Sequence, residues 1–333
     1  MKIGRLLTFA ISILCTLNAS VHPLFAEVPT TPKILFTSTR DGNRDVFIMN
    51  PDGSEQVNLT QHRAEDLQAV WSPTGEQILF ISDRGGLRDL YLMDSDGSNV
   101  RRFFKRKTKI YRKRPTWSPD GKQIVYGSIN WDRLETYIHI ATLGEQAEEE
   151  LVAGASYPSW SPDGSEIACT IGGRLTLINI RTGAQKQLLP KKAVNFQRDP
   201  AWSAVRDKLA FTWNKHPLPP VEAKRAVWDV WQAKMTIYIV NRDGTGLQQL
   251  IEEDGPYAQY PALSPNGKEV LYTQETHGNF QIFKLDLNSG VRTQLTHHLS
   301  WNTGGDWFDP VYALLVLPQP QLLTTTWGHV KKK

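Results

Sequence analysis

Short runs of apolar residues alternate with turn-forming residues along almost the whole chain. Residues 78–82 form one apolar run, residues 83–86 a polar turn and residues 89–93 an alternating run, and a tight turn follows at Asp96 and Gly97. An Asp-Gly pair between two such runs is a strong signal of an antiparallel hairpin. Because no segment keeps an apolar period of 3.6 residues, we predict an all-β chain in which helices are minor.

This unit repeats along the chain, and a Trp-Ser-Pro-x-Gly turn or a worn copy of it marks each repeat. The first position of that turn is held by Trp71, Trp117, Trp160, Trp202, Leu263 and Trp307. Successive members are 46, 43, 42, 61 and 44 residues apart, so one repeat carries an insertion. Four short strands per repeat of this length are typical of a propeller blade. We therefore predict a six-bladed β-propeller of four-stranded antiparallel blades, with the tryptophans packed between neighbouring sheets.

The two ends of the repeat region complement each other. Residues 34–60 supply the second, third and fourth strands of a blade, and residues 304–307 supply an innermost strand. Pairing of these N- and C-terminal strands would close the ring and protect its edges. We place the propeller at residues 33–317, with a surplus strand at 311–317. Residues 318–333 form a tail in which Trp327 is expected to dock on the propeller, because it is large and apolar.

The first 26 residues have a different pattern. Lys2 and Arg5 precede an apolar run at residues 6–17, and Pro23 and Ala26 follow it. This arrangement is typical of a secretory signal peptide, and the apolar run is short for a membrane span. We predict a signal peptide at residues 1–26, cut after Ala26, and a periplasmic or secreted protein; the alternative is an uncleaved anchor.

Charge and cysteine content add two limits. Removing the two basic residues of the signal from a total of 38 nearly balances the 34 acidic residues, so charge does not favour nucleic acid as a partner. Cys169 is the remaining cysteine, so an internal disulfide is excluded, and its apolar neighbours predict a small buried side chain.

These motifs resemble the TolB-like propeller repeat, whose consensus reads roughly W-S-P-D-G, then I-A-F-x-S, then I-Y-x-M-D-x-D-G. Residues 34–53 and 78–97 match it closely, and the resemblance extends over residues 33–310. It implies a six-bladed propeller and a protein-binding role in the cell envelope, since TolB itself is a periplasmic component of the Tol–Pal system. TolB carries an α/β domain before its propeller, which we expect to be missing here. Related propellers are fused to hydrolases or act as lyases on pectin fragments.

Catalytic motifs are absent from the sequence. It contains no G-x-S-x-G, H-E-x-x-H, paired C-x-x-C or P-loop pattern. We therefore predict a binding protein that is not an enzyme, needs no cofactor and holds no metal. Loop histidines leave an alternative open, because His62, His297 and His298 occupy loops of one face and could converge with His277 in a metal-dependent polysaccharide lyase.

A basic run offers a third hypothesis, a surface that binds an anionic glycan or lipid. Phe103, Phe104 and Tyr111 are interleaved with its nine basic residues. Those are Arg101, Arg102, Lys105, Arg106, Lys107, Lys109, Arg112, Lys113 and Arg114. The alternative is an edge strand guarded by charge against aggregation.

The long repeat contains the leading candidate for a partner site. Its insertion lies at about residues 213–233, and a long excursion between blade strands usually has a use. Tryptophan supplies contact area at low entropic cost. The predicted partner-binding residues are Trp213, His216, Trp228 and Trp231 of the insertion, with Trp131, His62, His297 and His298 on the same face. The alternative is that the tryptophans pack the loop onto its own blade, or that a short helix forms. The expected partner is an envelope protein, and the expected state is a monomer.

Overall fold

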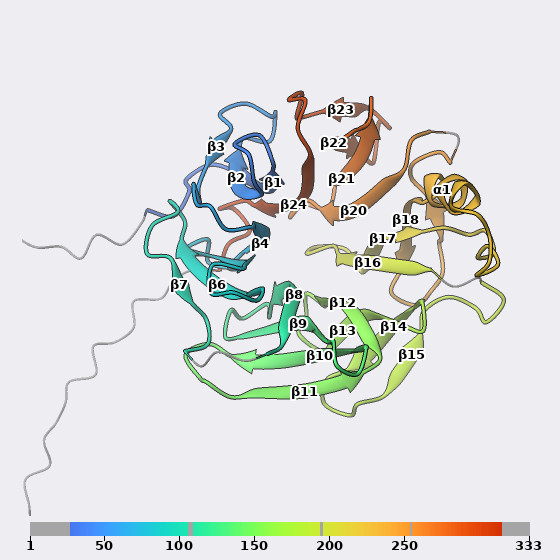
Figure 1. The fold of residues 1–333 in the computed structure, drawn as a ribbon, viewed down its shortest axis with the longest axis horizontal. Coiled ribbons are helices and arrows are strands. Elements are labelled where there is room, and N and C mark those ends of the chain that lie inside the picture. Colours follow the sequence, from blue (N-terminus) through green and yellow to red (C-terminus); the bar gives the residue numbers. More distant parts are fainter. Residues whose placement is uncertain (1–26, 106–108, 194–195, 254, 315–333) are drawn as a thin grey trace, which may run out of the picture.

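The computed structural model describes residues 27–105, 109–193, 196–253 and 255–314. Within them, 24 strands form six four-stranded antiparallel sheets around a central channel (Figure 1). The sheets are the blades of a propeller, so the predicted fold is confirmed.

Each blade runs from an innermost strand at the channel to an outermost strand at the rim, which has two or three residues in every blade except blade 3. Blade 1 contains β24 (Asn302–Phe308), β1 (Lys33–Ser38), β2 (Asp45–Met49) and β3 (Val57–Asn58). Blade 2 contains β4 (Asp66–Trp71), β5 (Gln77–Ser82), β6 (Asp89–Asp94) and β7 (Arg101–Arg102). Blade 3 contains β8 (Tyr111–Trp117), β9 (Gln123–Asn130), β10 (Glu135–Thr142) and β11 (Glu148–Ala153).

The second half of the ring is built in the same way. Blade 4 contains β12 (Ala155–Trp160), β13 (Glu166–Ile171), β14 (Arg174–Asn179) and β15 (Gln185–Gln187). Blade 5 contains β16 (Gln197–Trp202), β17 (Lys208–Trp213), the helix α1 (Arg225–Ala233), β18 (Thr236–Asn241) and β19 (Gln248–Gln249). Blade 6 contains β20 (Ala258–Leu263), β21 (Glu269–Thr276), β22 (Asn279–Asp286) and β23 (Arg292–Gln294).

The ring closes as predicted. β24 pairs antiparallel with β1, and Trp307 lies opposite Ile34 in the register. The predicted surplus strand is wrong for residues 311–314, which form a turn in which the Leu314 amide donates to the Pro73 carbonyl at 2.9 Å. The physical reason is a turn at Asp309, whose carbonyl accepts a hydrogen bond from the Tyr312 amide at 3.0 Å and whose Oδ1 accepts one from the Val311 amide at 3.0 Å. The predictions for residues 1–26, for the rest of that strand and for Trp327 lie outside the described residues.

The repeated turn fixes the hairpin between the first two strands of a blade. In blade 3 the Ser118 hydroxyl donates to Asp120 Oδ1 at 2.6 Å and accepts from the Gln123 amide at 2.9 Å. Gly121 closes the turn with a φ of 70°, a conformation that glycine adopts without strain.

The repeated tryptophans pack between neighbouring blades. The Trp202 indole donates to the Ser159 carbonyl of blade 4 at 3.2 Å, and the Trp307 indole donates to the Ala262 carbonyl of blade 6 at 3.2 Å. The Trp71 ring lies 5.2 Å from the Phe308 ring of blade 1. These contacts confirm the predicted core role, and Cys169 is buried as predicted.

Two ring faces are defined by strand direction. All six innermost strands begin on what we call the entry face, which also holds the turns between second and third strands. The repeated Trp-Ser-Pro-x-Gly turns lie on the opposite, exit face. In the described part of the chain, none of the helical structure is long and apolar enough for a membrane crossing.

Candidate binding site at the central channel

A β-bulge interrupts every innermost strand at the same position. The first bulge residue has a positive φ between 52° and 72° in all six blades, and these residues are Gln68, Arg114, Tyr157, Asp199, Tyr260 and Gly304. Such backbone costs about 1 kcal/mol or more for a residue other than glycine. A bulge re-aims its side chain, and all six residues line the channel.

The bulge residues meet across the channel. An Arg114 Nη atom of blade 3 lies 3.4 Å from Asp199 Oδ1 of blade 5. The Arg114 guanidinium also lies 4.3 Å from the centre of the Tyr260 ring in the opposite blade 6, and 5.3 Å from that of Tyr157 in blade 4. Arg114 therefore bridges the channel. Arg198 contacts the other oxygen of the same carboxylate, with its Nε 3.3 Å from Asp199 Oδ2.

Charge in this channel is strongly affected by burial. Burial acts to lower the pKa of Arg114, but the Asp199 carboxylate opposes this, and the net direction is upward. Burial also raises the pKa of Asp306 to about 7, even though its Oδ2 accepts a 2.7 Å hydrogen bond from the Trp71 amide. At neutral pH the channel thus holds a firmly charged arginine and a carboxyl group close to its titration point.

The cavity has a volume of about 460 Å³, and its mouth opens on the entry face. Trp301, which is 45% exposed, stands at this mouth and meets Phe280 edge-on at 5.5 Å. The Trp301 amide donates to the Thr39 hydroxyl at 3.1 Å. Arg44 and Arg88 also line the cavity. Sequence reasoning missed this mouth, although Trp301 directly precedes an innermost strand.

The predicted partner residues of the insertion divide into buried and open groups. Trp213 and Trp231 are buried, whereas Trp228 and His216 are half-buried. The insertion also contains α1, which confirms the alternative that a short helix forms there. The Trp231 indole donates to the His216 carbonyl at 3.2 Å, and its ring lies 4.6 Å from the Phe196 ring. These contacts fit the packing role that the sequence also allowed for Trp231.

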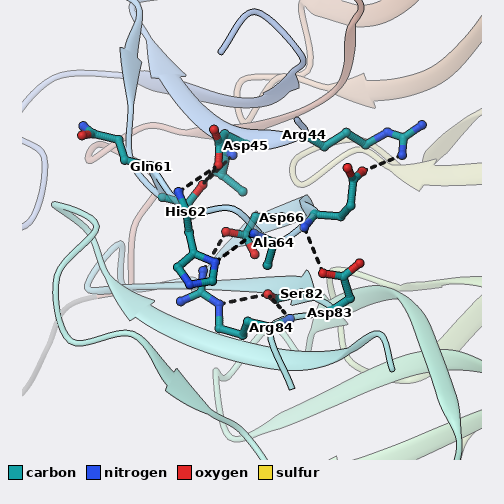
Figure 2. Close-up of polar contacts among 12 residues, drawn as sticks. Arg44, Asp45, Gln61, His62, Ala64, Asp66, Ser82, Asp83 and Arg84 are labelled. Atoms are coloured by element: carbon teal, nitrogen blue, oxygen red, sulfur yellow. Dashed lines mark hydrogen bonds and ion pairs between the residues drawn. The ribbon is translucent and has the colours of Figure 1, made fainter. Parts of the chain in front are cut away.

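The other predicted partner residues all lie in loops or turns of the entry face. Trp131 is 57% exposed and meets Tyr111 edge-on, and His297 and His298 are exposed. His62 lies at the seam between blades 1 and 2, where its Nδ1 accepts from the Ala64 amide at 3.0 Å (Figure 2).

Ion pairs fix the loop that holds His62. Arg44 binds Glu65 at 2.7 Å, and the Glu65 amide donates to Asp83 at 3.0 Å. Arg84 binds Asp66 at 2.6 Å on the blade 2 side of the same seam (Figure 2). Burial raises the pKa of Asp66 despite this ion pair. These contacts hold the loop at the seam, although Asp66 Oδ1 is buried without a hydrogen-bond partner among the described residues.

The basic run is divided between three environments. Arg101 and Lys105 are exposed near the rim of blade 2, and Lys109 is exposed just before β8. Arg112 is 1% exposed and binds Asp89 at 2.8 Å and Glu148 at 2.8 Å. Of the other three described members, Arg102 lies at the rim of blade 2, Lys113 Nζ lies 5.9 Å from the centre of the Tyr157 ring of blade 4, and Arg114 lines the channel. Arg106 and Lys107 lie outside the described residues.

In the described part of the chain, no group of three or more His, Cys, Asp or Glu side chains is arranged to hold a metal ion. His62 and His298 each use Nδ1 in a local hydrogen bond, to the Ala64 amide and the Ser300 hydroxyl.

Comparison with known families decides the relationship. The TolB β-propeller domain model matches residues 15–216, which is more than half of the chain. The chain belongs to the TolB β-propeller family. Its propeller resembles TolB from Acinetobacter baumannii, with a TM-score of 0.65 at 18% identity over 83% of this chain and 66% of that one. A TolB-type protein from Agrobacterium tumefaciens gives 0.61 at 15% identity over 83% of this chain and 92% of that one.

At the sequence level, an uncharacterised protein of Agrobacterium fabrum is 34% identical over 95 residues. The match covers 28% of this chain and 32% of that protein, so it spans about a third of the relative's length. At these identities the solved structures establish the shared fold.

Proposed function

We propose that this TolB-family propeller is an exported binding protein of the cell envelope that binds a protein partner over the channel mouth. The observation that carries the proposal is the chemistry of the channel. Its described wall contains tyrosine, phenylalanine, tryptophan and proline side chains and no histidine. Arginine, glutamine, threonine and aspartate side chains line the same wall, so it suits a partner that brings apolar side chains together with polar or charged groups.

The alternative of a metal-dependent lyase is not favoured by this geometry. A lyase of that kind needs histidine and carboxylate ligands converging at the opening. The nearest equivalents in the described channel are carboxylates already committed elsewhere, Asp199 to two arginines and Asp306 to the Trp71 amide.

Export is supported by sequence and family together. The basic start and short apolar run of residues 1–26 fit a signal peptide cut after Ala26. The TolB resemblance implies a periplasmic place of work. The entry-face loops with Trp131, His62, His297 and His298 and the insertion residues His216 and Trp228 belong to the proposed contact surface.

The decisive variant is Trp301→Ala, because this side chain stands at the mouth and is 45% exposed. Capture of the envelope partner should fall at least about tenfold, which corresponds to about 1.4 kcal/mol. Affinity capture from an envelope extract, followed by titration with the captured protein, measures the change. Trp131→Ala should weaken capture in the same direction.

Tyr312→Ala is the matched control, since Tyr312 is 46% exposed and lies in an exit-face turn. It should capture the partner as the unchanged protein does, and all variants should keep their melting temperature. Normal capture by Trp301→Ala, or an equal loss in Tyr312→Ala, would contradict the proposed surface.

A further inference from the structure

The helix of the blade 5 insertion has an apolar face wider than the blade covers. Trp231 and Trp228 turn toward the protein, where Trp231 packs against Phe196. Val227 and Val230 lie one turn apart on the same side of the helix but are 49% and 62% exposed. The tryptophans therefore fasten the helix, and the valines remain in water.

The segment leading into the helix extends this apolar surface. Leu218 is 49% exposed and Val221 is 93% exposed, which is unusual for large apolar side chains in one short insertion. Together, Leu218, Val221, Val227 and Val230 are called here the aliphatic ridge. The helix α1, which carries Val227 and Val230, lies at the periphery of the ring beside β17 and β18 (Figure 1).

Basic side chains are frequent in the insertion and in the loop that contacts its helix. The insertion contributes Lys224, Arg225 and Lys234, and the loop before β16 contributes Lys191 and Lys192. That loop is tied to the helix by the contact of Phe196 with Trp231 at 4.6 Å. Lys215 is left out of this group because Glu253 already binds it at 2.9 Å.

Acidic side chains in the insertion are fewer. They are Glu222 and Asp229, and Asp229 lies 3.9 Å from Arg225 in an exposed pair of little strength. Five basic side chains against two acidic ones give the ridge a positive border, so its electrostatic complement is an anionic surface.

We propose that the aliphatic ridge docks on an anionic phospholipid surface, with its valines entering the acyl boundary and its lysines contacting the phosphate groups. A convex ridge of aliphatic side chains bordered by lysine is the pattern of an interfacial helix. A protein partner more often uses exposed aromatic anchors, and here Trp231 is buried and Trp228 is half-buried against it. This contact goes beyond partner binding at the channel mouth and does not depend on it.

Co-sedimentation of the full chain with vesicles tests the proposal. The protein should bind vesicles of phosphatidylcholine with phosphatidylglycerol more strongly than vesicles of phosphatidylcholine alone. The double variant Val227→Ser and Val230→Ser should lower the partition coefficient at least about tenfold. The double variant Lys191→Glu and Lys192→Glu should weaken binding to the anionic vesicles alone.

The matched control is the double variant Val205→Ser and Val291→Ser. These valines are 50% and 60% exposed but lie in exit-face turns, so their loss should leave vesicle binding unchanged. All variants share residues 1–26, so any contribution of that segment to lipid binding cancels in the comparison. Melting temperatures check that each variant is folded.

Three results would overturn the proposal. The first is no sedimentation with either vesicle, and the second is equal loss in the two valine variants. The third is normal vesicle binding by the Val227 and Val230 variant together with weaker capture of a protein, which would assign the ridge to a protein partner. Trp301→Ala should leave vesicle binding intact, so failure of the channel-mouth proposal is recognised separately.

Discussion

Replacing Asp306 by asparagine should stabilise this propeller at neutral pH. Burial raises the pKa of Asp306 from 3.8 to about 7, so the folded protein binds a proton there more tightly than the unfolded chain does. The contribution of Asp306 to the free energy of unfolding is therefore fully present below about pH 4 and is lost as the pH rises toward about 7. Asparagine carries no charge, and its side-chain oxygen can still accept the hydrogen bond from the Trp71 amide.

The size of the effect follows from the two pKa values. One pKa unit corresponds to about 1.4 kcal/mol, so the difference between 3.8 and about 7 sets an upper bound of about 4 kcal/mol. The Asp306 side chain is half-buried, so its charge is not fully removed from the solvent and the bound is discounted. We therefore expect Asp306→Asn to raise the free energy of unfolding by about 1 to 3 kcal/mol at about pH 8. In a protein of this size that is a rise of about 3 to 9 °C in melting temperature.

Urea unfolding of both proteins at several pH values measures the effect. The two curves should nearly coincide at about pH 4 and separate steadily toward about pH 8. Asp132→Asn is a suitable control, because Asp132 is exposed in the turn after β9 and water solvates its charge in both states. A difference that does not vary with pH, or a loss of stability at every pH, would refute the reasoning.

Two further substitutions test the packing of the polar and apolar core. Arg112→Ala should lower the free energy of unfolding by about 3 to 5 kcal/mol, because Asp89 and Glu148 would lose their shared cation. The control Arg101→Ala, at an exposed position, should change the free energy of unfolding by less than about 1 kcal/mol. Equal effects of the two substitutions would argue against the buried ion pairs of Arg112. Trp231→Ala should lower the free energy of unfolding, measured in urea, by about 3 kcal/mol, while capture of the partner at the channel mouth is kept. Lost capture of the partner with an unchanged free energy of unfolding would assign Trp231 to the contact surface instead.

The blades were predictable because their signals are local and repeat. A strand alternates its side chains with a period of two, and the Ser118 turn fixes where the next strand begins. Six copies of that pattern define six blades, and the missing innermost strand near residue 34 predicts its own replacement near Trp307. The extra strand was wrong because hydrogen bonds to Asp309 turn the chain, and apolarity at residues 311–314 does not report that turn.

The channel lining was harder to predict, because a bulge reverses the alternation on which sequence reasoning depends. A signal does exist: Arg114, Tyr157, Asp199 and Tyr260 each precede a proline and stand three positions before the repeated Trp or Leu. Proline at the second bulge position lacks an amide donor and suits an interrupted ladder. The meeting of Arg114 with a tyrosine from the opposite blade, however, depends on ring geometry.

The basic run shows why closeness in sequence does not define a patch. Residues that follow one another on a strand point to opposite faces, so in β8 Arg112 enters the interface between blades 2 and 3 while Lys113 points the other way, toward Tyr157 of blade 4. The bulge then turns Arg114 into the channel. A single anion-binding surface would need these side chains on one face. The exposed members at the rim are therefore the part of the run to which the anion hypothesis still applies.

The insertion shows the same limit for hydrophobic residues. Its sequence identifies tryptophans as candidates, yet a large aromatic side chain can anchor a loop or meet a partner with equal ease. The fold decides between these roles through the Trp231 contacts with Phe196 and the His216 carbonyl, which use the ring and the indole donor internally. Once the tryptophans hold the helix in place, the part of its apolar face that the blade does not cover becomes the surface, and Val227 and Val230 on that part remain exposed.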